Sequence, residues 1–168
     1  EAQREVDPCI QWGVNLAQGA ISQAFADNCA AAGVPQNHTG SGVSVSVVSG
    51  GGVGVLDPET SRAWTASFIL TPQLAFLPDT QLSLAIDYFN IEINGEIAQL
   101  SPGSILSSCY GSDFFPTDPL CNQFYRYSDL AALGPGNPLY DQYFEPGTLE
   151  NVAVVFDSFF NINSQKNQ

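Results

Sequence analysis

The segment "LDPETSRAWTASFILTP" (Leu56–Pro72) decides the fold of this chain, because large apolar side chains alternate in its centre with small or polar ones. A two-residue period of this kind is typical of a β-strand that has one apolar face. We therefore predict a strand over Ser61–Thr71, with Trp64, Phe68 and Leu70 on the apolar face. The function depends on what that face contacts in so acidic a chain.

A second strand pattern follows over Gln81–Asn94. Its first half places Leu82, Leu84 and Ile86 on one face with a period of two, but from Phe89 onward the apolar residues fall on the other face. A one-residue shift of this kind inverts the two faces of a strand. We expect either a bulge near Tyr88–Phe89 or a strand that passes from one environment into another.

Two shorter apolar patterns complete the strand prediction. Val43–Val48 alternates valine with serine, and Asn151–Asn163 places apolar residues at mostly alternate positions. Between the two long strands, "PQLAFLPD" (Pro72–Asp79) contains two prolines and predicts a turn. We therefore expect a mainly β fold with an incomplete antiparallel sheet of about four strands.

Short helices are expected in the segments outside the strands. The alanine-rich stretch Asn15–Gly33 spaces its larger apolar residues as one helix face would. Ser101 followed by Pro102 is typical of a helix start, because serine caps the first turn and proline fits its first position. Tyr110–Phe144 is rich in aspartate, proline and aromatic residues, and we expect a long ordered loop there.

The length of 168 residues suggests a single domain over 1–168 that can bury a substantial core. Within it we expect a loop and helix region, a strand region, a helix followed by a long loop, and a last strand with a polar tail. These regions span residues 1–42, 43–98, 99–149 and 150–168, in that order.

The charge balance excludes several classes of partner. Charged residues make up 12% of the chain, and the net charge is −13. Nucleic-acid phosphates would repel such a chain, because their binding depends on lysine and arginine, and anionic lipid surfaces would not attract it. We therefore expect no nucleic-acid partner. The basic residues are Arg4, Arg62, Arg126 and Lys166.

The 4 cysteines predict disulfide bonds rather than a zinc site, because none of them forms a CxxC pair and the chain has 1 histidine. Four cysteines allow about three alternative pairings. Sequence spacing favours the local one, in which Cys9 pairs with Cys29 and Cys109 pairs with Cys121. Disulfides imply an oxidising compartment, which is the periplasm, the cell surface or the outside of the cell.

No set of residues in the sequence supports catalysis. His38 lies in the polar segment "QNHTG" and is interpreted as an exposed loop residue, and one histidine alone does not make a Ser-His-Asp triad. Asn37–Thr39 is a glycosylation sequon, so Asn37 is a candidate glycan acceptor. We expect no enzyme activity, no cofactor and no bound metal. Some loop acids would suit calcium but are better explained as solvated side chains: Asp113, Asp118, Asp129 and Asp141.

Four stretches, taken in order, resemble part of the β-barrel of TonB-dependent outer-membrane receptors. They are "LDPETSRAWTASFILTP", "LPDTQLSLAIDYFNIEINGEI", "ILSSCY…DPLCNQFYR" and "LENVAVVFDSFFNIN". In addition, "DPC" (Asp7–Cys9) and "NCAAAGVP" (Asn28–Pro35) are similar to a cysteine-bearing extracellular loop of that family. The order and spacing of these stretches match over nearly the whole chain.

The resemblance implies strands with one lipid-facing side and places the Pro72–Asp79 turn in the periplasm. It also supports the two local disulfides and a location outside the cell or in the outer membrane of a Gram-negative bacterium. The plug domain and most strands of such a receptor are not among these residues, and a closed membrane barrel needs at least about eight strands. The side chains that would face lipid or an assembly partner are Trp64, Phe68, Leu70, Leu82, Leu84 and Ile86.

Two functions follow from these expectations. In the first, open strand edges and apolar faces of several copies dock onto one another. The chain is then a non-enzymatic structural module that forms an extracellular homo-oligomer or helical filament. In the second, the chain is a fragment of a TonB-dependent transporter for siderophore, vitamin or glycan uptake, and it contacts a membrane only as part of a full barrel. The first is the function that we expect.

Overall fold

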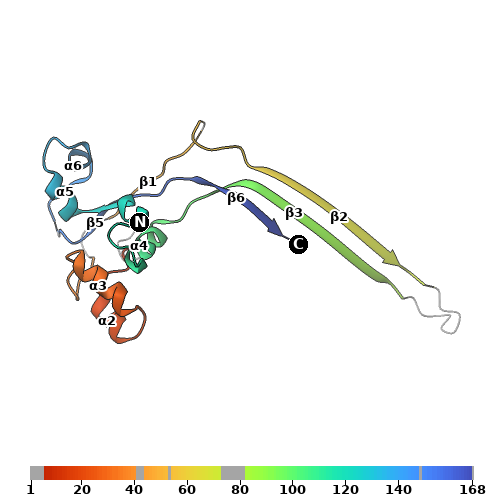
Figure 1. The fold of residues 1–168 in the computed structure, drawn as a ribbon, viewed down its shortest axis with the longest axis horizontal. Coiled ribbons are helices and arrows are strands. Elements are labelled where there is room, and N and C mark those ends of the chain that lie inside the picture. The colour runs from red at the N-terminus through yellow and green to blue at the C-terminus, as the bar shows by residue number, and fades with distance from the viewer. Residues whose placement is uncertain (1–5, 41–43, 53, 73–81, 148, 168) are drawn as a thin grey trace. The chain divides into compact units, whose positions relative to one another are not determined.

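The computed structural model describes residues 6–40, 44–52, 54–72, 82–147 and 149–167, with the side chains of 163–167 outside the description. The chain divides into two compact units (Figure 1). Unit 1 comprises Glu1–Gly50 and Gln99–Ser158, and unit 2 comprises Gly51–Ala98 and Phe159–Gln168. The two units are described separately, and the prediction of a single domain stays a prediction.

Unit 1 contains a small mixed sheet whose central strand is β5 (Val152–Phe156). Strand β1 (Ser46–Val48) pairs with β5 in parallel, and β4 (Phe124–Arg126) pairs with it antiparallel. The residues of β5 from Val152 to Val155 are buried without alternation, because other elements of the unit cover both faces of the strand.

Short helices surround this sheet in unit 1, and their starts follow local sequence signals. Helix α3 begins after Ser22, whose side chain accepts a hydrogen bond from the Phe25 backbone. Helix α4 begins after Ser101 with proline at its first position, as the sequence predicts. The bounds are α2 Trp12–Ala17, α3 Gln23–Ala31, α4 Pro102–Gly111, η1 Pro119–Gln123, α5 Tyr127–Leu133 and α6 Pro138–Tyr143.

Both predicted disulfides are confirmed in unit 1. Cys9 is bonded to Cys29, and Cys109 is bonded to Cys121. The first bond attaches α3 to the segment that precedes α2, and the second attaches the end of α4 to η1. Cys9, Cys29 and Cys109 are fully buried in the main apolar cluster of the unit. The bonds fit an oxidising compartment.

Removing either disulfide should destabilise unit 1 by about 3 kcal/mol, because the unfolded chain regains the freedom of a closed loop of ordinary length. The sequence separations are 20 residues for Cys9–Cys29 and 12 for Cys109–Cys121, so the two losses should be similar. Urea unfolding of the paired variants Cys9→Ser with Cys29→Ser and Cys109→Ser with Cys121→Ser measures the effect. Unfolding midpoints equal to wild type would contradict it.

Unit 2 is an antiparallel sheet in the order β2-β3-β6. Strand β2 (Thr60–Leu70) pairs with β3 (Leu84–Ala98) along its full length, and the two run side by side in Figure 1. Strand β6 (Phe160–Asn167) pairs only with the second half of β3. Asn161 fastens this end of the sheet, because its amide donates to the backbone oxygens of Asp57 (2.9 Å) and Gly95 (2.7 Å).

The β-rich class, with an unclosed sheet and short helices pinned by disulfides, is confirmed. Several finer expectations are wrong. The Asn15–Gly33 helix is interrupted at Gly19, which has a φ of 70°. The Asn151–Asn163 pattern is two strands in two sheets, and the Tyr110–Phe144 segment contains β4 and three short helices instead of one loop. Most of the Pro72–Asp79 turn lies outside the described residues.

The expected bulge at Tyr88–Phe89 is also wrong, because the register between β2 and β3 is continuous from Thr60 opposite Asn94 to Leu70 opposite Leu84. The other explanation of the shift in pattern fits the structure. The first half of β3 is exposed, whereas Asn90–Ile93 are half-buried where β6 joins the sheet. The strand therefore passes from one environment into another.

Candidate functional site on the β2–β3 hairpin

One face of the β2–β3 hairpin carries a row of large, exposed apolar side chains. Phe68 lies opposite Ile86, and Leu70 lies opposite Leu84. The rings of Trp64 and Tyr88 extend this row, with their centroids 4.9 Å apart. We call the following set the hairpin face: Trp64, Phe68, Leu70, Leu84, Ile86 and Tyr88.

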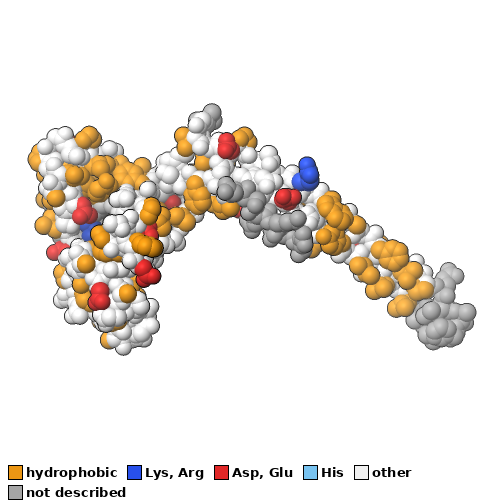
Figure 2. All heavy atoms as spheres, viewed as in Figure 1, with side chains coloured by type: hydrophobic (Ala, Val, Ile, Leu, Met, Phe, Trp, Pro, Cys, Tyr) orange, Lys and Arg blue, Asp and Glu red, His pale blue; other side chains and the backbone are white. Residues whose placement is uncertain are grey.

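The whole hairpin face is exposed to solvent, from 45% for Leu70 and Tyr88 to 59% for Phe68. Leu82, just before β3, is 51% exposed, so every predicted assembly or lipid-facing residue lies at the surface. The space-filling view shows apolar side chains along this hairpin (Figure 2). Single exposed apolar residues are common on proteins, but a contiguous row marks an interaction site.

The opposite face of the hairpin is more polar. Thr65 and Ser67 lie there on β2, and the Ser67 hydroxyl donates a hydrogen bond of 2.5 Å to the Asp87 carboxylate on β3. The large apolar residues on that side are Ile69, Phe89, Ile91 and Ile93, and the last two are half-buried where β6 pairs with β3. The two faces therefore differ in chemistry, and a partner that prefers apolar contacts would bind the hairpin face.

The strand edges of the hairpin are open as well. Among the described residues, no strand pairs with the outer edge of β2, and none pairs with β3 over Leu84–Asn90 on the side away from β2. Such edges present unpaired backbone N–H and C=O groups that can pair with another strand. A hairpin of two strands is marginal in water by itself.

The described part of unit 2 has no buried core of its own. Among the described residues, all apolar side chains that are buried belong to unit 1, where they surround β5 and the disulfides. No described residue of unit 2 falls in the buried class. Burial of apolar surface is the main favourable term in folding. The described part of the hairpin therefore makes no buried apolar contact of the kind that usually stabilises a sheet.

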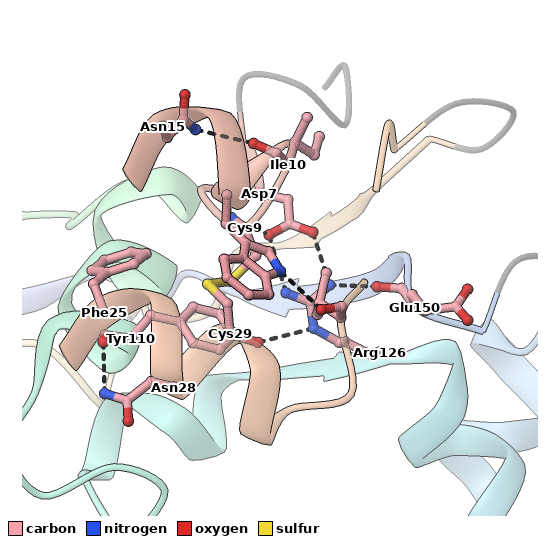
Figure 3. The surroundings of a disulfide bond; sticks show 12 residues. Asp7, Cys9, Ile10, Asn15, Phe25, Asn28, Cys29, Tyr110, Arg126 and Glu150 are labelled. Carbon is pink, nitrogen blue, oxygen red and sulfur yellow. Dashed lines mark hydrogen bonds and ion pairs between the residues drawn. A yellow bond between two sulfur atoms is a disulfide. The ribbon is translucent and has the colours of Figure 1, made fainter. Parts of the chain in front are cut away.

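Unit 1 contains a buried ion pair that the sequence did not reveal (Figure 3). The Arg126 guanidinium donates to both carboxylate oxygens of Asp7, at 2.8 and 3.0 Å, and to the Tyr110 hydroxyl at 2.9 Å. It also donates to the backbone oxygen of Glu150. Arg126 and Asp7 are each only 2% exposed. The guanidinium is thus neutralised and hydrogen-bonded, as a buried charge requires.

The environment of this cluster shifts the pKa values of Arg126 and Tyr110. Burial by itself would lower the pKa of Arg126, but the hydrogen bonds and charge of Asp7 outweigh it and raise that pKa. Burial also raises the pKa of Tyr110, although the neighbouring guanidinium acts in the opposite direction. The pair joins residues that are 119 positions apart in the sequence, so its role is to hold unit 1 together.

The expectation of an exposed His38 is wrong. Its side chain is 7% exposed, and its backbone oxygen accepts a hydrogen bond from the Gln11 backbone. Burial lowers its pKa, because the charged imidazolium loses hydration. Arg126 lowers this pKa further, whereas Asp7 and Glu150 raise it. Asn37, the candidate glycan acceptor beside it, is exposed.

The depressed pKa of His38 predicts that unit 1 loses stability in mild acid. Below pH 6.5 the unfolded chain takes up the proton while folded His38 stays neutral, so the free energy of unfolding falls until the pH reaches the lowered pKa. Urea midpoints at pH 7.5 and 5.5 measure this loss. His38→Gln should reduce the difference between the two midpoints, and an unchanged difference would contradict the prediction.

Three of the acidic loop residues accept hydrogen bonds from residues close to them in the sequence. Asp118 accepts hydrogen bonds from the Ser112 hydroxyl and the Leu120 backbone, and Asp129 accepts one from the Arg126 backbone. Asp141 accepts one from the Gly136 backbone. Within the described part of the chain, no group of three or more His, Cys, Asp or Glu residues is placed to hold a metal ion.

Among the described residues, none of the helices has the length and apolar character needed to cross a membrane. No protein-family model, curated protein or solved structure matches this chain. The site itself therefore carries the functional argument.

Proposed function

We propose that this chain is a non-enzymatic structural module that self-associates, through the hairpin face and the open edges of β2 and β3, into an extracellular homopolymer. The observation that carries the proposal is an exposed apolar face on a sheet that has no buried apolar side chain among its described residues. A second copy of the chain supplies both of the partners that the described part of this sheet lacks, which are apolar surface and a strand edge.

The hairpin face supplies the driving force for this contact. Full burial of one large apolar side chain contributes about 1.5–3 kcal/mol. The side chains of the hairpin face are already half-covered by their neighbours, so each contributes about half of that on docking. Together, these contributions offset a substantial part of the free-energy cost of the translational and rotational freedom that two copies lose when they associate.

The open edges favour a protein partner over lipid. Acyl chains cannot hydrogen-bond the unpaired backbone groups of β2 or of Leu84–Asn90, and each unsatisfied group in hydrocarbon is costly. A strand from another copy satisfies these groups. The same contact can cover the hairpin face, so one partner meets both requirements.

The arrangement of the edges favours a chain of copies. In the order β2-β3-β6, the free edge of β2 and the free half-edge of β3 lie on opposite sides of the hairpin. Pairing of one edge with the other is head-to-tail, and a head-to-tail contact that does not close into a ring produces a filament. The proposed product is therefore an open polymer.

Salt should promote this assembly. Every copy carries a net charge of −13, so copies repel one another at low ionic strength. The six side chains of the hairpin face are uncharged, and the charged residues on the same side, Arg62 and Glu92, lie opposite each other at the end of the row beyond Trp64. Raising NaCl from about 10 to 150 mM shortens the screening length from about 30 to 8 Å. Sedimentation velocity without detergent should show larger species at the higher salt. Dispersal by salt would contradict a contact made through the apolar face.

The alternative function is that of a fragment of a TonB-dependent outer-membrane transporter for siderophore, vitamin or glycan uptake. It is supported by the resemblance of four stretches of the sequence to that family and by the apolar row of the hairpin face. In this case the neighbouring strands of the parent would pair with both open edges, and lipid would cover the hairpin face. Material that becomes monodisperse only in detergent would favour it.

A further inference from the structure

Unit 1 contains a cavity of about 670 Å³ that the proposed assembly does not use. It lies between the end of α3, the end of α4, η1, β4 and α5, and all of its lining residues belong to unit 1. Its volume falls in the range of small-molecule sites. The hairpin face, which belongs to unit 2, contributes nothing to it.

Aromatic side chains form a stable wall of this cavity. Tyr110 is stacked on Phe115 with centroids 5.5 Å apart and contacts Phe124 at 5.8 Å. The disulfide between Cys109 and Cys121 belongs to the same lining. Stacked rings beside a covalent crosslink lose little freedom when a ligand binds, and a flat apolar ligand can extend the stack.

The polar groups of the lining include two oxygens that accept no hydrogen bond from a described residue. The Asn28 amide donates to the backbone oxygen of Tyr110 (Figure 3) and to that of Ser112. No described residue donates to its side-chain oxygen. Asp129 accepts the Arg126 backbone N–H through one carboxylate oxygen, and no described residue donates to the other. A ligand with N–H donors matches these acceptors.

The charged residues of the lining, Arg126 and Asp129, determine which ligand charge the cavity favours. Arg126 belongs to the lining, but its guanidinium is already paired with Asp7 and hydrogen-bonded to Tyr110 and Glu150. It is therefore not free to bind an anion. Asp129 leaves a carboxylate in the lining, and the net charge of −13 adds to the attraction for cations. We propose that this cavity binds a small aromatic amine in its protonated form.

A charge series of probes on the full chain tests the proposal. Saturation-transfer NMR, which does not require a monomer, would compare tryptamine with indole-3-acetate, which carries the opposite charge on a similar ring system. Tryptamine should bind up to about fivefold more tightly, because an exposed ion pair contributes up to about 1 kcal/mol. Butylamine, which has the charge without the ring, should give no saturation transfer. If butylamine binds as tightly as tryptamine, non-specific attraction of cations to an acidic protein explains the binding, and the proposal is overturned.

Two variants locate the binding. Ala31→Trp fills the cavity from α3 and should abolish tryptamine binding, whereas Ala30→Trp, an exposed neighbour on α3 that is not in the lining, should leave it intact. Asp129→Asn keeps an acceptor for the Arg126 backbone and should remove the preference for tryptamine over indole-3-acetate. Unchanged binding in Ala31→Trp, or equal loss in both tryptophan variants, would overturn the proposal. None of these results depends on whether copies assemble.

Discussion

Phe68→Asp is expected to abolish self-assembly while unit 1 stays folded. Phe68 is the most exposed member of the hairpin face at 59%, and it lies opposite Ile86 in the middle of the row. A carboxylate at this position would be buried without a partner in any contact that covers the face, and an unpaired buried charge costs several kcal/mol. Sedimentation velocity without detergent should show small species only.

Thr65→Asp is the matched control for this variant. It introduces the same charge on the same strand, but on the opposite face of the hairpin, where Thr65 is exposed. Assembly should persist in Thr65→Asp because that carboxylate stays in water. If the two variants assemble equally well, the hairpin face is not the contact. If both fail equally, general charge repulsion explains the loss and the face does not.

Asp7→Asn is expected to destabilise unit 1 by about 3–5 kcal/mol, because it leaves the Arg126 guanidinium buried without a counter-charge. Urea unfolding at pH 7 with intact disulfides measures the loss. The control is Asp27→Asn on α3, an exposed carboxylate that accepts a hydrogen bond from Gln23 and should change stability by less than about 0.5 kcal/mol.

The partner of Asp7 provides a further check on this account. If the cost arises from an unpaired buried charge, the double variant Asp7→Asn with Arg126→Gln should recover part of the stability, because neither charge remains. Strictly additive losses in the double variant would show that the two side chains act independently. That result would be inconsistent with the hydrogen bonds at 2.8 and 3.0 Å.

Structural features that depend on residues close together in the sequence could be predicted from it. The period of two over Ser61–Thr71 gave a strand within one residue of β2, because alternation reports directly on strand geometry. Ser101 and Pro102 marked the start of α4, because capping depends on adjacent residues. The disulfide pairing followed from short spacings. The same alternation placed Trp64, Phe68 and Leu70 on one face of β2 and Leu84 and Ile86 on one face of β3.

Structural features that depend on contacts between residues far apart in the sequence could not be predicted. His38 is buried by elements from elsewhere in the chain, so its polar sequence neighbours were misleading. Arg126 and Asp7 are 119 residues apart, and no pattern in either segment points to the other. The strand β4 has only 3 residues and no alternation to detect. The division of the last apolar pattern between β5 and β6 depends on which sheet each half joins.

The proposed function requires that copies of the chain contact one another through the exposed hairpin face and the open edges of β2 and β3. Electron microscopy of the wild-type protein at physiological salt, without detergent, tests this contact. We expect regular filaments in the wild type and in Thr65→Asp, and none in Phe68→Asp. Small uniform particles, or aggregates that disperse only in detergent, would contradict it and would favour a piece of a membrane transporter.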